Sequence, residues 1–162
     1  MTEWRKNMVE VNTKAFGKIA VEDDKLIRFE HGILGFPDLK DFTLIYDIDK
    51  GNESAIKWLQ SIQEPGFAMP VMNPDLVVAH YVPEFDRELL KPLGENLDSE
   101  NILILVTVTV PKDITKTTVN LKAPIIVNIE ERKAVQLICD DEAYSIKHNI
   151  YDELMAKKAA NA

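Results

Sequence analysis

The side chains that most often do chemistry are sparse in this sequence, and they do not group into a familiar site. None of the histidines, His31, His80 and His148, lies at i+2, i+3 or i+4 from another ligand-type residue in an arrangement that resembles a metal site. Asp47 and Asp49 alternate at the end of one predicted strand, but two carboxylates without a third ligand or a glycine turn make a poor calcium site. We therefore expect no metal and no other cofactor.

The sequence also lacks the common catalytic motifs. The sequence contains no G-x-S-x-G elbow, no phosphate-binding G-x-x-x-x-G-K loop and no dinucleotide fingerprint. Cys139 falls on the same face of a predicted strand as Val135 and Leu137. This position is typical of a small buried hydrophobe rather than a reactive thiol. We expect a non-catalytic protein, and a small enzyme that uses two of the many carboxylates is the alternative.

Composition and charge limit the remaining classes. The chain has 162 residues, 46% of them hydrophobic, which predicts one domain over 1–162 with its core at about 8–148 and a tail at 149–162. With 19 basic and 27 acidic residues the net charge is −8, which disfavours nucleic acid and favours a basic protein partner. A direct RNA-binding β-barrel is a second alternative. Without an apolar leader or spanning segment, we expect a cytoplasmic protein and no membrane contact.

Alternating apolar residues predict that the fold is mainly β, a small antiparallel barrel or sandwich. Short strands are separated by Gly, Pro, Asn and Asp, and a hairpin is expected around Lys14 and Ala15. The predicted strands are 8–13, 16–21, 25–29, 42–48, 56–62, 67–72, 77–82, 102–110, 117–129 and 133–139. The segment 102–106 is apolar on both parities, which predicts a central strand covered on both faces.

Only two segments have helical spacing. One short helix is predicted at 83–93, before Gly94, and a C-terminal helix at 150–158. The second carries Lys157 and Lys158 in its last turn, where cations favour the helix dipole. Its role and the oligomeric state of the protein are left open.

Residues 120–128 combine a strand pattern with an unusual set of polar groups. Asn120, Lys122 and Asn128 share one parity, which predicts a solvent-facing side, and Pro124 predicts an edge strand or a bulge. An edge strand offers backbone groups to a partner's strand. We therefore expect these three residues to be candidates for partner binding.

Residues 32–36 allow two interpretations. Gly32 and Gly35 can provide positive-φ corners, or Ile33, Leu34 and Phe36 can present an apolar surface to a partner. A nucleic-acid-binding G-x-x-G loop lies between two helices and has basic or polar central residues. Here a predicted strand precedes the glycines and the central residues are apolar, so that interpretation is excluded.

Other candidate positions also have a structural interpretation. Trp58 shares a strand face with Gln60 and is either core or an interface anchor, and Asn73 with Asp75 marks a turn. Glu84 and Asp86 come at the start of the predicted short helix, where they are either solvated charges or part of an acidic contact.

Several of these segments resemble the flagellar assembly factor FliW family. The resemblance runs from about Val9 to His148, with Leu34 where the family more often has proline. The segments that carry it are 13–19, 29–36, 58–61, Asn73 with Pro74, 120–128, and Tyr144 to His148.

The resemblance implies a function that the residues alone do not. Proteins of this family bind flagellin in the cytoplasm and also bind CsrA, a small basic RNA-binding dimer. By similarity, this chain is expected to antagonise CsrA and so relieve repression of flagellin translation. Tyr144 and His148 are included among the expected partner-binding residues, although His148 can equally close one end of the barrel by hydrogen bonding.

Overall fold

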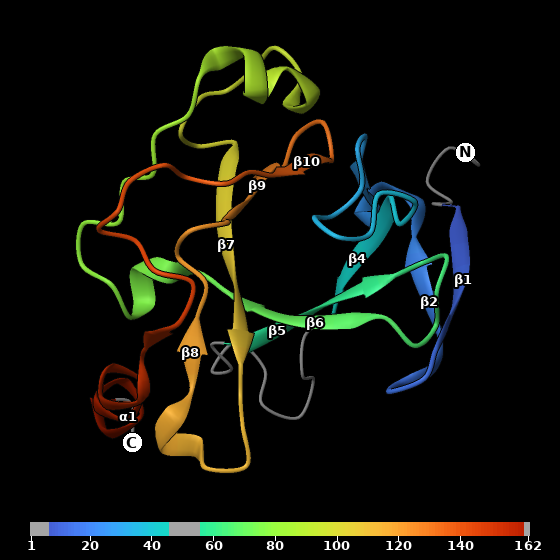
Figure 1. Ribbon diagram of the computed structural model, residues 1–162. Helices are drawn as coiled ribbons and strands as arrows, with labels where there is room; N and C mark the ends of the chain where they lie inside the picture. The colour runs from blue at the N-terminus through green and yellow to red at the C-terminus, as the bar shows by residue number, and fades with distance from the viewer. Residues whose placement is uncertain (1–6, 46–55, 161–162) are drawn as a thin grey trace.

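The computed structural model describes residues 7–45 and 56–160 (Figure 1). Its strands are β1 (Met8–Thr13), β2 (Gly17–Glu22), β3 (Ile27–Phe29), β4 (Asp41–Ile45), β5 (Ile56–Ser61), β6 (Ala68–Met72), β7 (Ile102–Thr109), β8 (Thr118–Val119), β9 (Ile125–Asn128), β10 (Lys133–Gln136) and β11 (His148–Asn149). The helix α1 spans Tyr151–Ala160, and the 3-10 helices are η1 (Asp23–Lys25), η3 (Pro74–Leu76), η4 (Arg87–Leu93) and η5 (Ile114–Lys116). The predicted strand at 42–48 is described only as far as Ile45, and Asp47 and Asp49 lie outside the described residues.

Seven strands close into a barrel in the order β3, β4, β5, β6, β7, β9 and β10, and β10 returns to β3. The expected barrel is therefore confirmed. All the pairs are antiparallel except β10 with β3, which is parallel and pairs Lys133 with Arg28. Outside the barrel, β8 and β11 extend the sheet from β7, and β1 and β2 form a separate hairpin at the predicted place.

Strand β7 is the central strand that its sequence predicts. It pairs with β6, β8 and β9 along its length. Leu105 points into the barrel core with Phe29, Phe42 and Leu59, and neighbouring Val106 points into a second core on the opposite face. Both side chains are fully buried, which explains why this strand is apolar on both parities.

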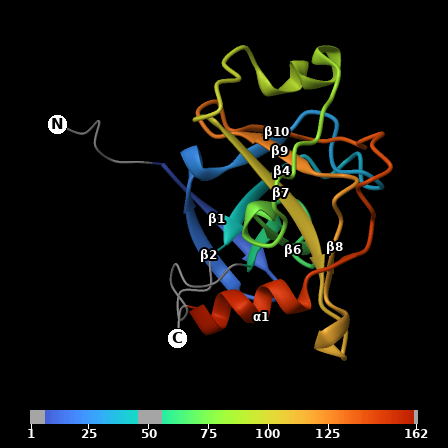
Figure 2. The same ribbon diagram turned by 90° about the vertical axis from the view of Figure 1, so that its left-hand side faces the viewer.

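The second core lies between β7, β8 and the C-terminal part of the chain. Met72, Val106 and Val119 meet Ile150 there, and Leu154 of α1 packs against the same cluster. Figure 2 shows α1 lying across the end of the molecule below β6 and β8. The predicted C-terminal helix is confirmed, and it packs back on the barrel. No helix in the described ranges is long and apolar enough to cross a bilayer.

The prediction of one half-buried strand over 117–129 is wrong, and of the two positions that Pro124 indicated, a sheet edge and a bulge, the edge is not found. The segment is divided into β8 and β9 by a bend, because Asn120 Oδ1 accepts hydrogen bonds from Lys122 N at 3.0 Å and Ala123 N at 3.1 Å. Pro124 follows this bend directly. Strand β9 then pairs with β7 on one side and β10 on the other, so it has no free edge.

Two further elements differ from their predictions. Residues 77–82 form no strand, because Asn73 and Pro74 begin η3 and the chain then continues irregularly, with Val77 and Tyr81 buried. The short helix predicted at 83–93 is a 3-10 helix that begins only at Arg87 and contains Pro92, which has no N–H for a helical bond. It ends before Gly94, as predicted, where φ is +92°.

Candidate partner-binding surface

The loop between β3 and β4, called here the 30–40 loop, exposes large apolar side chains on a fixed backbone. Gly32 has a φ of +71°, and a Cβ there would lie 2.5 Å from Pro37 O, so only glycine fits. Ile33 is buried in the barrel core and exchanges two hydrogen bonds with Phe36, Phe36 N to Ile33 O at 2.7 Å and Ile33 N to Phe36 O at 3.2 Å. Gly35, with a φ of +86°, completes the turn.

The structure confirms the positive-φ corners and shows which apolar side chains of the loop are exposed. The two glycines do make positive-φ corners, and the residues between and after them face solvent. The exposed fractions are 45% for Leu34 and 49% for Phe36, whereas Ile33 at 3% is an anchor and not part of the surface.

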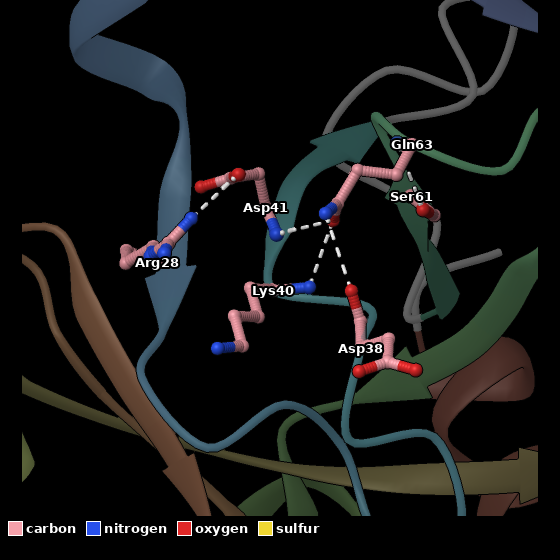
Figure 3. Close-up of polar contacts among 6 residues, drawn as sticks. All are labelled: Arg28, Asp38, Lys40, Asp41, Ser61 and Gln63. Atoms are coloured by element: carbon pink, nitrogen blue, oxygen red, sulfur yellow. Dashed lines mark hydrogen bonds and ion pairs between the residues drawn. The ribbon is translucent and has the colours of Figure 1, made fainter.

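A side chain from the turn between β5 and β6 holds the backbone of this loop. Gln63 Oε1 accepts hydrogen bonds from Lys40 N at 2.8 Å and Asp41 N at 3.0 Å, and Gln63 Nε2 donates to Asp38 O at 3.2 Å (Figure 3). Ser61 Oγ in turn accepts from Gln63 N at 3.1 Å, which positions the glutamine. The loop is thus fixed before any partner arrives.

Two more contacts fix the strands that flank the loop and the tip of the loop. Arg28 and Asp41 form an ion pair at 2.8 Å between β3 and β4, drawn beside the glutamine in Figure 3. Gln136 of β10 accepts a hydrogen bond from Leu34 N at 3.1 Å and donates one to Ala123 O at 3.2 Å.

Beside Phe36 the surface is hollowed. This Phe36 hollow has a volume of about 350 Å³. Phe36 packs edge-on against Phe67 with ring centroids 4.7 Å apart. Among the described residues, neither Asp38 nor Glu64 makes an ion pair, and both are exposed. The residues that line the hollow are Gly35, Phe36, Pro37, Asp38, Leu39, Glu64 and Phe67.

The predicted pair Trp58 and Gln60 is mostly internal. Trp58 is half-buried and meets Phe16 of the β1–β2 turn at 6.1 Å between ring centroids. Gln60 is fully buried and donates from Nε2 to Ser61 O at 3.0 Å and Pro65 O at 3.2 Å, while its Oε1 has no hydrogen-bond partner among the residues that the structure describes. In this structure Gln60 offers no surface to another protein.

Asn128 is the clearest correction to the predicted solvent-facing row. It has no exposed surface, and its Nδ2 donates to Leu93 O at 2.8 Å and Asn96 O at 3.0 Å. Its Oδ1 accepts from Glu131 N at 3.2 Å. The amide thus joins η4 and the β9–β10 turn to the outside of the barrel.

Asn120, Lys122 and Tyr144 come together around the bend between β8 and β9. Tyr144 OH accepts a hydrogen bond from Val82 N at 2.9 Å, and its ring meets that of Tyr81 at 4.7 Å. Tyr81 OH donates to Leu121 O at 2.6 Å, and burial, with smaller contributions from Cys139 and Tyr144, raises the pKa of this phenol.

Several polar atoms of this group are used internally. The side-chain oxygen of Asn120 makes the bend itself, and Lys122 O accepts a hydrogen bond from Cys139 N at 2.6 Å. His148 lies in β11, where it pairs with Val119, the residue before Asn120.

The acidic candidates do not form one cluster. Asn73 Oδ1 accepts from Asp75 N at 2.9 Å, as a simple turn would, and Asp75 is exposed on η3. Glu84 and Asp86 are exposed before η4. The two 3-10 helices, drawn as green and yellow-green coils, lie well apart in both views (Figures 1 and 2).

The surface with the most coherent geometry therefore contains Leu34 and Phe36 from the predicted set, and several residues that the sequence did not reveal. Gln63 is separated from the backbone groups it holds by more than twenty positions, so no local pattern announces it. Phe67 was predicted as an ordinary strand residue. In the described part of the chain, no group of three or more His, Cys, Asp or Glu residues could hold a metal ion. The chemistry of the hollow suits binding of an apolar group beside a cation.

A closed seven-stranded barrel with an added hairpin and a packed C-terminal helix defines the class of protein as a small β-barrel. A solved structure described as "Crystal structure of the flagellar assembly factor FliW" is similar, with a TM-score of 0.79 and 29% sequence identity. The similarity covers 88% of this chain and 96% of that chain.

Sequence comparison gives the family. The family model described as FliW protein matches residues 10–150. The flagellar assembly factor FliW of Lachnospira eligens is 48% identical over 153 residues, which cover 94% of this chain and all of the relative. That of Leptospira biflexa is 38% identical over 147 residues, which cover 90% of this chain and 94% of the relative. The chain belongs to the FliW family of flagellar assembly factors.

Proposed function

We propose that this protein is a non-catalytic partner switch of flagellar assembly, acting in the cytoplasm. In this role it binds flagellin and antagonises the translational regulator CsrA, which relieves repression of flagellin translation. The observation that carries the proposal is the end-to-end match with relatives named flagellar assembly factors, including one at 48% identity. A fixed loop with exposed Leu34 and Phe36 supports it, because a partner-binding protein needs an accessible apolar surface.

The switch would follow flagellin supply. When flagellin accumulates it occupies the protein, CsrA is released, and translation of flagellin stops. Export of flagellin frees the protein to bind CsrA again. Neither step requires bond chemistry in this chain.

Calorimetric titration tests the proposal directly. The protein is titrated with CsrA and with flagellin from the same organism, and each titration is repeated with the other partner present. Binding of both, with CsrA binding lost in the presence of flagellin, is the expected result. Failure of both partners to bind at micromolar concentrations would leave the family assignment intact and remove the proposed mechanism.

Salt dependence gives a second prediction. The net charge of −8 should attract a basic dimer, so the affinity for CsrA should fall as ionic strength rises. The titration is repeated between about 50 mM and 500 mM salt, where the Debye length falls severalfold. A constant affinity across this range would show that charge does not contribute.

A further inference from the structure

We propose that the Phe36 hollow is the docking site for a cationic segment of the basic partner, with one apolar side chain seated against Phe36 and Phe67. A Lys or Arg of the same segment would pair with Asp38 or Glu64. This inference rests on the proposed function, in which CsrA is the basic partner. It assigns a surface to that partner.

The apolar part of the site is already in place. Phe36 is 49% exposed although its ring packs on Phe67, so one face is left for another apolar group. The volume of about 350 Å³ lies at the lower end of the range for ligand pockets, about 300–1,000 Å³. That size suits one or two side chains of a peptide.

The loop does not need to become ordered when a partner binds. Gln63 holds two backbone groups of the loop and one at the start of β4, Gln136 holds Leu34 N, and the paired bonds between Ile33 and Phe36 close the tip. A surface fixed in advance avoids the entropy cost of ordering on association. This is the expected property of a docking site, whereas loose apolar residues would bind more weakly.

Charge selects the occupant. Asp38 and Glu64 both line the hollow, are exposed and form no ion pair within the described part of the chain, although Glu64 Oε1 accepts a hydrogen bond from Gly66 N at 3.3 Å. The cationic residue of β3, Arg28, is already paired with Asp41. An acidic rim around an apolar floor complements a segment that carries Lys or Arg beside an apolar anchor, and it disfavours an acidic segment.

The experiment compares two hollow variants with two matched controls. Phe36→Ser removes the apolar anchor, and Ile114→Ser removes a side chain of similar exposure, 53%, on η5. The double change Asp38→Lys with Glu64→Lys reverses the rim, and Asp98→Lys with Glu100→Lys alters the net charge equally, from −8 to −4, in the segment before β7. Figures 1 and 2 show the η5 and 94–101 segments apart from the 30–40 loop.

The affinities for CsrA and for flagellin are measured for all variants, together with the midpoint of urea unfolding. Phe36→Ser should weaken CsrA about tenfold, as truncation of an interface anchor does. The rim reversal should weaken CsrA by about tenfold or more, and its charge-matched control by less than about threefold, because distant exposed charges are screened. Flagellin affinity should be unchanged in every variant.

Three outcomes would overturn the inference. These are unchanged CsrA affinity in both folded hollow variants, equal losses in the rim reversal and its control, and loss of flagellin binding in place of CsrA binding. Failure of the wild-type protein to bind either partner would instead contradict the proposed function. If Phe36→Ser lowers the unfolding midpoint, the rim reversal still decides the result.

Discussion

The 30–40 loop and the 120–128 segment use the same kind of side chain for opposite purposes. In the loop, an amide from outside, Gln63, holds the backbone and leaves Leu34 and Phe36 in solvent. In the 120–128 segment the amides belong to the segment itself, and Asn120 and Asn128 turn their polar atoms onto the protein's own backbone.

The difference shows that polar residue type alone does not mark a recognition surface. An amide whose donors and acceptors are all used inside the fold contributes stability and has little left for a partner. An apolar side chain on a fixed exposed loop contributes little to stability and has surface available for a partner. Changes in the 120–128 segment should therefore reduce stability, and changes at the loop tip should reduce binding.

The largest expected effect is at Asn128. Asn128→Ala leaves the carbonyls of Leu93 and Asn96 and the N–H of Glu131 without this partner, which should cost about 3 kcal/mol of unfolding free energy. Urea unfolding measures the change. The control is Asn12→Ala at an exposed position of β1, where a change below about 0.5 kcal/mol is expected. Similar values for the two variants would mean that the buried amide network does not stabilise the fold.

The next effect is a pH dependence at Tyr81, beside the 120–128 segment. An unfolded tyrosine ionises near pH 10, and burial raises the pKa of Tyr81 in the folded state. The neutral phenol thus stabilises the fold fully below about pH 10, and this contribution is lost as the pH rises further, by at most about 1.4 kcal/mol per unit.

Tyr81→Phe isolates this contribution. The variant should be less stable than wild type at pH 8, by about 1 kcal/mol, because Leu121 O loses its hydrogen-bond donor. Between pH 9 and 11 the unfolding free energies of the two proteins should converge. Curves that stay parallel across this range would show that the phenol does not titrate with folding.

Gln63→Ala tests the clamp on the loop, with a smaller expected cost. Water can replace the amide at this exposed position, so the unfolding free energy should fall by only about 0.5–1 kcal/mol. Hydrogen exchange at Lys40 and Asp41 should become roughly fivefold faster, while exchange in β7 keeps its wild-type rate. Unchanged exchange at both amides would mean that the loop is held by other contacts.

The smallest effect on stability is expected at the loop tip. Leu34→Asp replaces a side chain that is 45% exposed, so the unfolding free energy should change by no more than about 0.5 kcal/mol. Partner binding, measured by calorimetry, should be reduced in the same variant. Unfolding of the variant would identify Leu34 as a core residue and contradict the surface assignment.

Much of the barrel could be predicted from the sequence because its strands alternate in the ordinary way. The pattern at 102–106 correctly indicated a strand covered on both faces, and the corners at Gly32 and Gly35 followed from their type and spacing. These features follow from the local sequence and from the rule that a strand apolar on both faces is covered on both. Closure of the barrel by a parallel pair, β10 with β3, has no local signal.

The candidate site was less predictable for a physical reason. Alternation predicts a solvent-facing side only when one face of the sheet is uncovered, and the outer face of β9 is covered by η4 through Leu93 and Ile126. Asn128 shares that face and is buried with it. The contacts of Gln63 and Gln136 with the 30–40 loop join positions far apart in the chain, so they appear only in the folded structure.

Hydrogen exchange of the protein alone and bound to CsrA is the most direct test of the contrast between the two regions. We predict slower exchange within residues 33–39 and 64–67 on binding, with the amides of residues 120–128 unchanged. Protection confined to residues 120–128, with the loop exchanging at its free rate, would contradict the account and return partner binding to the amide-rich segment.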